Sequence, residues 1–217
     1  MHNHIIPCVD DGSKSLEMSR EMVLKEIEYG VDKIILTPHM NKNDKDKSKI
    51  LEQYNKLVEY VSDLNVELYL GSEIYYYDDI ISDLKNGTLL TINNTKYILV
   101  EFSTRVETPI VDICSDLIVS GYIPIIAHIE RYYYLTHEDY KNLHKMGALI
   151  QINSKTFTSK DFKKTLKKMY KDNLIDLVAS DAHNNTSRCV DFTYLLKKKN
   201  KYINIFNKME EFYLQVK

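Results

Sequence analysis

The sequence predicts an α/β fold in which a single domain, residues 1–217, forms a barrel of parallel strands. Short apolar runs alternate with amphipathic helical patterns, and no break in composition divides the chain. Acidic residues or histidines follow most of these runs, and a parallel barrel brings all its strand ends to one mouth. The alternative is an open doubly wound sheet, which gathers its site at one switch point, whereas these residues are spread over the whole set of strands.

Helices are predicted where apolar residues recur every three or four positions. The first pattern begins near Leu16 and ends at Gly30, a residue type that commonly stops a helix. The second is a long amphipathic helix over 43–64. Further helices are predicted over 75–84, 108–120, 137–145, 159–170, 186–199 and 202–214.

The strands are the short apolar runs between these helices. The seven predicted strands are 31–36, 66–70, 88–92, 96–102, 123–127, 148–152 and 175–179. Asn93 and Asn94 separate the third strand from the fourth, and such a pair favours a turn, so these two strands are predicted to form a hairpin.

Composition narrows the functional class. Lys and Arg number 29 against 31 for Asp and Glu, a net charge of −2 that disfavours a dedicated nucleic-acid binder. The lysine-rich stretches 163–171 and 197–201 are predicted to be solvated helix faces. Cys8, Cys114 and Cys189 are too few and too far apart for a disulfide framework, so a cytoplasmic protein is expected. No membrane-spanning segment or secretory signal is visible.

The residues that carry chemistry begin at the start of the sequence. His2 and His4 stand two positions apart, and in an extended strand they point to the same side, where two imidazoles can bind one divalent metal. Metal-ligating residue types then recur at the ends of the apolar runs. The candidate ligands are His2, His4, Asp10, His39, Glu73, Glu101, His128, Asp181 and His183.

Taken singly, His39 and His128 are better explained as core histidines, Glu101 often as half of a buried ion pair, and Asp10 most often as a turn residue. Taken together, the candidates favour a metal site. Imidazoles and carboxylates without a thiolate suit Mn, Fe, Zn or Co. Nine ligands are too many for one ion, but bridging carboxylates can hold two or three metals about 3.5–4 Å apart, as in metal-assisted hydrolysis. His137 and His144 fall in a predicted helix and are expected at the surface.

Two arginines are candidates for holding an anion. Arg131 lies three residues after His128, and Arg188 lies five after His183. Guanidinium binds phosphate in a bidentate manner, although a structural salt bridge explains either arginine equally well. No cysteine is followed six positions later by arginine, so a cysteine-dependent phosphatase is excluded, and no nucleophile elbow, P-loop or dinucleotide fingerprint is present.

With these motifs the chain resembles the polymerase-and-histidinol-phosphatase (PHP) superfamily. Within it, the closest resemblance is to the bacterial metal-dependent protein-tyrosine phosphatases of capsule and exopolysaccharide synthesis, the CpsB/YwqE type. The motifs that carry the resemblance are His2-Asn3-His4, Asp10-Asp11-Gly12, Thr37-Pro38-His39, Gly71-Ser72-Glu73, Val100-Glu101-Phe102, Ala127-His128-Ile129-Glu130-Arg131 and Ser180-Asp181-Ala182-His183.

The resemblance implies a distorted (β/α)₇ TIM-like barrel and three divalent metals, with Mn²⁺ expected and Fe, Zn, Co or Mg as alternatives. The implied ligands are His2, His4, Glu73 and Asp181 for the first metal, Glu73, Glu101 and His128 for the second, and Asp10, His39 and His183 for the third. Arg131 and Arg188 would bind the phosphate. Only Met1 precedes the first histidine here, so the first strand is expected to be shortened or trimmed, and Ile129 replaces the usual proline with a small expected effect.

The activity implied is hydrolysis of phosphotyrosine on a protein by a metal-bridging hydroxide. The implied partner is the tail of a membrane-associated tyrosine autokinase that controls polysaccharide synthesis. The phenolate leaving group has a pKa of about 10, so no general acid is assigned. Residues 75–77 and 132–134 are all tyrosines that could form an aromatic wall, although plain packing also explains them. The alternatives are another PHP phosphoesterase such as a histidinol-phosphatase, a non-catalytic metal-binding regulatory module, and a nuclease, which the charge disfavours.

Overall fold

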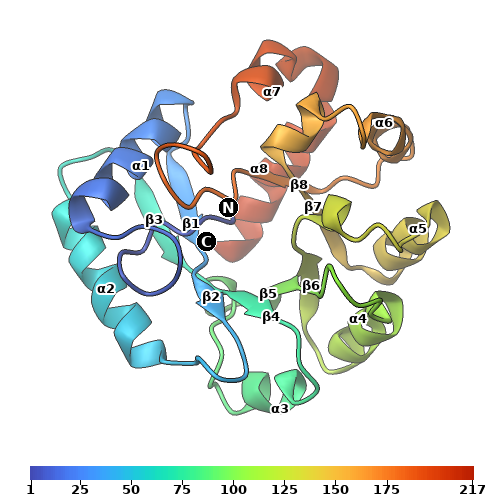
Figure 1. Ribbon diagram of the computed structural model, residues 1–217, viewed down its shortest axis with the longest axis horizontal. Coiled ribbons are helices and arrows are strands. Elements are labelled where there is room, and N and C mark those ends of the chain that lie inside the picture. Colours follow the sequence, from blue (N-terminus) through green and yellow to red (C-terminus); the bar gives the residue numbers. More distant parts are fainter.

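The computed structural model describes residues 1–217 and has the predicted α/β architecture, with strands at the centre and helices around them (Figure 1). A six-stranded parallel sheet has the order β2-β4-β5-β6-β7-β8, and β1 pairs in parallel with β3 separately. The strands are β1 (Lys33–Leu36), β2 (His39–Met40), β3 (Glu67–Leu70), β4 (Glu73–Tyr75), β5 (Tyr97–Glu101), β6 (Ile123–Ile126), β7 (Leu149–Asn153) and β8 (Leu177–Ala179).

The predicted helices are present, with shifted ends. They are α1 (Leu16–Glu28), α2 (Lys47–Tyr60), α3 (Ile80–Lys85), α4 (Ile110–Val119), α5 (His137–Met146), α6 (Lys163–Lys171), α7 (Thr193–Lys197) and α8 (Ile203–Val216). Capping sets some of these ends: Thr136 and Asp139 form a capping box at the start of α5, and Gly147 ends that helix in the left-handed conformation. The segment predicted as a helix over 75–84 becomes helical only at Ile80, because β4 extends to Tyr75.

The predicted seven-stranded barrel is wrong in its closure. The strands form a curled, open sheet of six and a separate pair. β1 and β3 correspond to two predicted strands and pair only with each other, whereas the short β2 and β4, which the sequence did not predict as strands, join the larger sheet. Pro38, which lacks an N–H, separates β1 from β2, and Gly71 with Ser72 separates β3 from β4. Residues 2–4 lie between the two open edges: Asn3 forms an isolated bridge with Ala182, and its carbonyl accepts a hydrogen bond from the Thr37 N–H at 3.1 Å.

The predicted hairpin across Asn93 and Asn94 is also wrong. Both asparagines adopt left-handed backbone angles, as expected for a turn, but they lie in a 3₁₀ turn (Ile92–Asn94). The segment before them is not a strand: Leu90 is buried, and its carbonyl accepts a hydrogen bond from the Ser72 hydroxyl. After the turn, β5 runs parallel to β4 and β6, so the chain crosses over rather than turning back.

The alternation of side chains along the strands decides where the site lies. Outward residues such as Ile98 and Val100 join the large core of 41 buried residues between strands and helices. Inward residues such as Leu99 join a smaller core of 10, which Phe212 and Val216 of α8 complete at the amino end of the strands. The next inward positions lie at the carboxyl ends, where parallel α/β folds place their ligands.

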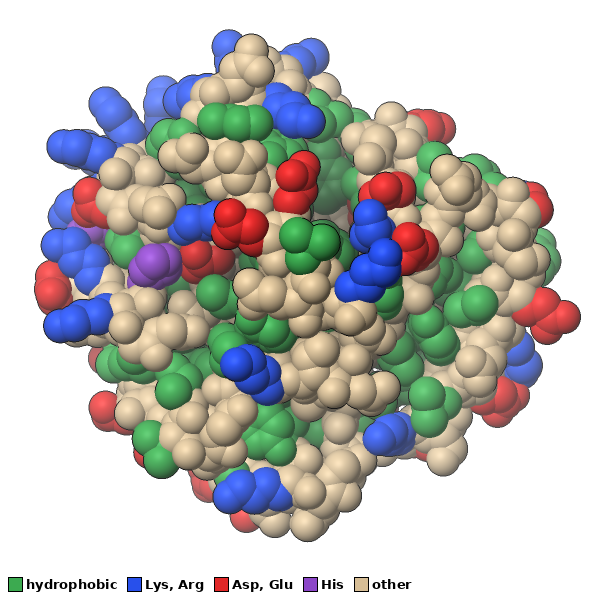
Figure 2. All heavy atoms as spheres, turned by 180° about the vertical axis from the view of Figure 1, so that it is seen from behind, with side chains coloured by type: hydrophobic (Ala, Val, Ile, Leu, Met, Phe, Trp, Pro, Cys, Tyr) green, Lys and Arg blue, Asp and Glu red, His purple; other side chains and the backbone are tan.

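The outer surface agrees with the composition. No helix has both the length and the apolar character needed to cross a membrane. The lysines of α6 and of 197–201 are exposed, as predicted for solvated faces. Basic side chains gather along one edge of the molecule in Figure 2.

Candidate metal centre

The predicted ligand residues lie at or just beyond one end of five strands. His39 and Glu73 are the first residues of β2 and β4, just beyond the carboxyl ends of β1 and β3, and they pair with each other in register. Glu101 is the last residue of β5, and His128 and Asp181 each lie two residues beyond the carboxyl end of β6 and β8. Four overlapping groups have ligand atoms within 4.8 Å of one another. These groups are His4, Asp11, His39 and His183; His2, Glu73 and His128; His2, His4 and Asp181; and His39, Glu73 and Glu101.

Glu73 is the centre of the cluster. Its Oε1 lies 3.1 Å from His2 Nε2 and 3.0 Å from His128 Nε2. Its Oε2 lies 3.2 Å from His4 Nε2 and 3.1 Å from His39 Nδ1. Burial alone would raise the pKa of this carboxyl, but the surrounding imidazoles, His2 above all, hold the pKa well below its usual range. Glu73 is therefore an anionic bridge among four imidazoles.

Three of the histidines are prepared to bind metal through Nε2. Their Nδ1 atoms are each occupied: His2 by Gln151 Oε1 at 2.9 Å, His4 by Asp10 Oδ2 at 2.7 Å, and His183 by the Asp181 carbonyl at 3.0 Å. Their Nε2 atoms are buried and have no hydrogen-bond partner. Buried polar atoms are rarely left unpaired, and a second hydrogen bond of this kind typically orients a metal-binding histidine. The site therefore fits divalent metal ions.

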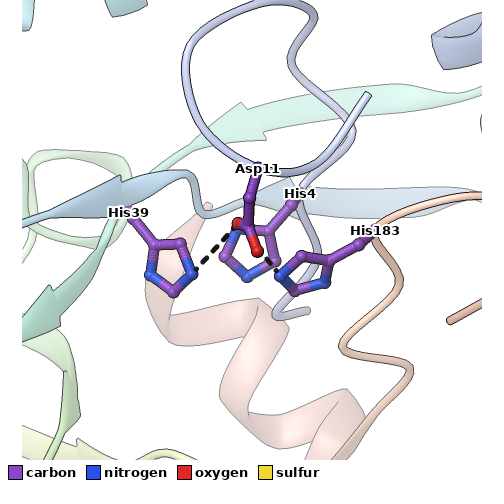
Figure 3. A group of neighbouring side chains, drawn as sticks. All are labelled: His4, Asp11, His39 and His183. Atoms are coloured by element: carbon purple, nitrogen blue, oxygen red, sulfur yellow. Dashed lines mark ion pairs between the residues drawn. The ribbon is translucent and has the colours of Figure 1, made fainter. Parts of the chain in front are cut away.

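The acidic loop between His4 and α1 does not place its carboxylates as predicted. Asp10 lies in none of the four groups, because its Oδ2 accepts hydrogen bonds from His4 Nδ1 and from the His39 N–H at 3.0 Å. Asp11 lies in the site instead, with Oδ1 3.4 Å from His183 Nε2 and 3.5 Å from His39 Nε2 (Figure 3). The sequence signal for this placement is the adjacent pair Asp10-Asp11, in which either carboxylate is a candidate ligand.

Gly12 allows this loop to fold back over His4. A Cβ atom at Gly12 would lie 2.2 Å from the His4 carbonyl oxygen, so no other residue fits. The next residue, Ser13, donates its N–H to the same carbonyl at 3.0 Å. The close approach fixes Asp10 beside His4 and leaves Asp11 directed at the other two imidazoles.

Backbone strain is concentrated at the candidate ligands. Seven non-glycine residues have positive φ, and three of them are His2 at 59°, His128 at 31° and Asp181 at 50°. Left-handed backbone costs energy for most residues, less for Asp and His than for branched side chains, and residues held in it cluster at functional sites. After His128 the chain forms a 3₁₀ turn (Ile129–Arg131) that buries Ile129 in the core.

Both predicted arginines meet at one carboxylate. Arg131 hydrogen-bonds Asp181 Oδ2, and Arg188 Nη2 lies 3.1 Å from Oδ1 and 3.2 Å from Oδ2 of the same residue. Burial would raise the pKa of Asp181, but His2 and Arg131 lower it overall. The two arginine side chains are 37% and 40% exposed, which leaves their remaining donors available to an anion at the mouth.

Two further pKa shifts describe the metal-free cluster. Burial, reinforced by the neighbouring Glu73, raises the pKa of Glu101 to about 7. Burial and the neighbouring His4 lower the pKa of His183 to about 4, so His183 is neutral at pH 7. A neutral imidazole is the form that binds a metal.

The remaining predicted residues lie outside this cluster. Tyr132 is fully buried, and its hydroxyl accepts the Phe102 N–H, so it is a core residue rather than part of a wall. Tyr75 is 41% exposed and lines a cavity of about 460 Å³ that also contacts His39 and Glu101. His137 and His144, predicted at the surface, are half-buried and pair with Asp172 at 2.7 Å and Asp176 at 3.3 Å.

Comparison with known proteins identifies the family. The family model described as "Capsular polysaccharide synthesis, CpsB/CapC" matches residues 1–211. The chain belongs to the CpsB/CapC family.

Members of the CpsB/CapC family with assigned names are similar over most of this chain. The tyrosine-protein phosphatase CpsB of Streptococcus agalactiae serotype V is 35% identical over 200 residues, which cover 85% of this chain and 82% of that protein. The tyrosine-protein phosphatase YwqE of Bacillus subtilis is 34% identical over 213 residues, which cover 92% and 84% of the two chains.

Solved structures agree with this assignment. One from the work on YwqE of Bacillus subtilis and CpsB of Streptococcus pneumoniae, described as unique metal-dependent tyrosine phosphatases, matches with a TM-score of 0.86 and 32% identity, covering 96% of this chain and 90% of the other. The Listeria monocytogenes protein hisK, a candidate histidinol phosphatase, matches with a TM-score of 0.52 and 12% identity, covering 84% and 93%. The second match shows a shared fold alone.

Proposed function

We propose that this CpsB/CapC-family chain is a metal-dependent protein-tyrosine phosphatase whose catalytic domain spans residues 1–217. The observation that carries the proposal is the set of buried, unpartnered Nε2 atoms on His2, His4 and His183, which face carboxylates at the mouth of the fold. The names and structures of the similar phosphatases support the same reaction.

The site would hold three divalent metals, with Mn²⁺ as the expected ion. The proposed ligands are His2, His4, Glu73 and Asp181 for the first, Glu73, Glu101 and His128 for the second, and Asp11, His39 and His183 for the third. Asp10 supports His4 and His39 rather than binding metal. When bound, the metals would neutralise phosphate charge and lower the pKa of water, so that a nucleophile is available at neutral pH.

Arg131 and Arg188 would hold the non-bridging oxygens of the phosphate. Both side chains already point at the mouth, because Asp181 anchors one end of each guanidinium group. Planar guanidinium groups present paired donors that match a phosphate, and fixed donors near developing negative charge stabilise a transition state. No side chain is assigned as a general acid, because a phenolate with a pKa of about 10 leaves with little help.

The aromatic ring of the substrate would lie in the cavity that Tyr75 lines. This cavity of about 460 Å³ contacts His39 and Glu101 at its inner side, so a phosphate at the metals would direct its ester group into it. Aromatic rings stack favourably, which supports an aryl phosphate over an alkyl phosphate. Tyr132 takes no part, since it is buried in the core.

The expected substrate protein is the tyrosine-rich tail of a membrane-associated tyrosine autokinase that controls capsular or exopolysaccharide synthesis. Membership of a capsular polysaccharide synthesis family supports this context. We place the chain in the cytoplasm, and the three free cysteines are consistent with a reducing compartment.

A substrate comparison tests the proposal. We predict that the Mn²⁺-loaded chain hydrolyses a phosphotyrosine peptide with a kcat/KM at least tenfold above that for histidinol phosphate, a selectivity of about 1.4 kcal/mol. The reverse preference would indicate a histidinol-phosphatase. Failure to hydrolyse either substrate, with metal bound, would indicate the non-catalytic regulatory module.

The two neighbouring aspartates give a second prediction. Asp11→Asn should lower the number of Mn²⁺ ions bound per chain by one, because Asp11 is a proposed ligand of the third metal. Asp10→Asn should keep the number and weaken binding roughly 10- to 100-fold, as expected for a group that orients a ligand. Metal content after gel filtration and isothermal titration measure the two effects. Loss of one ion in Asp10→Asn with full content in Asp11→Asn would reverse the assignment.

A further inference from the structure

Strand β7 differs from the other strands of the six-stranded sheet because it contributes no candidate metal ligand. In the six-stranded sheet, β2, β4 and β5 carry a candidate ligand, β6 and β8 are followed by one, and β7 contributes none. The inward positions at its carboxyl end are Gln151 and Asn153, two positions apart and therefore on the same face. Gln151 is fully buried and Asn153 is 9% exposed, so both amides lie inside the fold directly beside the metal centre.

The two amides form a continuous chain of hydrogen bonds between candidate ligands. Gln151 Oε1 accepts from His2 Nδ1 at 2.9 Å and from the His128 main-chain N–H at 2.7 Å. Gln151 Nε2 donates to Asn153 Oδ1 at 2.9 Å. Asn153 Nδ2 donates to Asp181 Oδ2 at 3.0 Å. The chain therefore joins both histidine-bearing segments on one side to the carboxylate on the other.

The direction of this chain is fixed at both ends. An ionised Asp181 can only accept, so Asn153 must turn its NH₂ group toward it and its carbonyl toward Gln151. A main-chain N–H can only donate, so Gln151 must turn its carbonyl toward His128. With both amides fixed, the same Gln151 oxygen faces His2 Nδ1, which must carry a proton. In the neutral form of His2, the form that binds a metal, Nε2 is then the ring nitrogen with the free lone pair, and it is the atom directed at Glu73 and Asp181.

The half-buried Glu130 fixes the carboxyl end of β7. Glu130 Oε1 accepts the Asn153 N–H at 3.1 Å and the Thr156 hydroxyl at 2.7 Å. Glu130 lies between His128 and Arg131 in the chain, so the same turn that presents these two residues also fixes the strand end that carries the amides. The amides therefore have little freedom to rotate or shift.

We infer that Gln151 and Asn153 are positioning residues that form a directional amide relay, which commits His2 to bind metal through Nε2 and orients Asp181. The inference rests on the metal centre of the proposed function, but it concerns ligand geometry rather than turnover. Such supporting contacts typically change metal affinity 10- to 100-fold.

The test uses the full chain loaded with diamagnetic Zn²⁺ and labelled with ¹⁵N in its histidines. In the wild type we expect His2 to bind Zn²⁺ through Nε2 and to show an Nδ1–H that exchanges slowly with solvent. Gln151→Met, which keeps the volume but replaces the amide oxygen with a thioether sulfur that is only a weak acceptor, should weaken Zn²⁺ binding 10- to 100-fold and speed exchange of that proton at least tenfold. Gln151→Glu keeps an acceptor for His2 Nδ1–H, so the slow exchange of that proton should be retained. An ionised glutamate cannot donate to Asn153, so this variant removes only that hydrogen bond of the relay.

Several results would overturn the relay. One is a ¹⁵N spectrum of the wild-type chain that shows Zn²⁺ bound to His2 Nδ1. This measurement does not depend on the folding of any variant. Another is a folded Gln151→Met chain with Zn²⁺ affinity within twofold of wild type and a protected Nδ1–H. A wild-type chain that binds no Zn²⁺ would overturn both the relay and the proposed function. A chain that binds Zn²⁺ as expected, but does not hydrolyse phosphotyrosine with any metal, would contradict the proposed phosphatase function and leave the relay unaffected.

Discussion

Replacing Glu73 by glutamine is expected to lower kcat/KM on a phosphotyrosine peptide by about 10³-fold or more. Glu73 contacts four imidazoles within 3.2 Å and is the proposed bridge between two metals, so the amide removes the one carboxylate that both metals share. If the metals no longer contribute about 4 kcal/mol to stabilising the transition state, the rate falls by about three powers of ten. Steady-state kinetics at saturating Mn²⁺, together with the metal content per chain, measure the effect.

A matched control for this variant is Glu59→Gln. Glu59 is exposed on α2 and makes no ion pair, so its substitution should leave both rate and metal content unchanged. Circular dichroism establishes that both variants are folded. A folded Glu73→Gln chain with more than a tenth of the wild-type kcat/KM would show that this carboxylate is not a metal bridge.

Asp181→Asn is expected to lower kcat/KM by about 10²- to 10³-fold, as loss of a preorganised charged group at the reacting centre does. Asparagine keeps the shape and tolerates the left-handed φ of 50°, so the backbone should remain in place. Its neutral amide removes a metal ligand and also the anion that anchors Arg131 and Arg188. The measurement is kcat/KM on the peptide together with bound Mn²⁺, and the loss should appear in both.

Asp112→Asn is the control for Asp181→Asn, because Asp112 is exposed on α4 and makes no ion pair. We expect wild-type rate and metal content from it. If Asp181→Asn bound the wild-type number of Mn²⁺ ions and turned over at a near-normal rate, the first metal would have been assigned to the wrong carboxylate.

The sequence was informative wherever a side chain followed a buried strand. Glu101 is inward because it shares a face with Leu99, and period-two alternation makes this predictable once the strand is recognised. The same reasoning reached His128 and Asp181, which follow the buried runs of β6 and β8. These residues converge because parallel strands end at one edge, a property of the topology rather than of any local preference.

The features that the sequence did not predict depend on close contacts made after folding. The choice between Asp10 and Asp11 follows from the approach of Gly12 to the His4 carbonyl, which no local pattern encodes. The sheet does not close because β1 and β3 end before Pro38 and Gly71 and pair only with each other, while the short β2 and β4 begin beyond these residues and join the larger sheet. The sequence does not predict the role of Gln151, because amides carry no metal-ligand signal; the spacing of Gln151 and Asn153 at a strand end is the pattern that points to it.

The measurement that tests the proposed metal-dependent mechanism most directly is phosphotyrosine-peptide hydrolysis by protein stripped with a chelator and then refilled with Mn²⁺. We predict that stripping abolishes turnover, that about three Mn²⁺ ions per chain restore it, and that alkylation of the thiols leaves it intact, because no cysteine lies in the cluster. Turnover that survived complete removal of metal, or that was lost on alkylation but not on chelation, would contradict a mechanism based on these imidazoles and carboxylates.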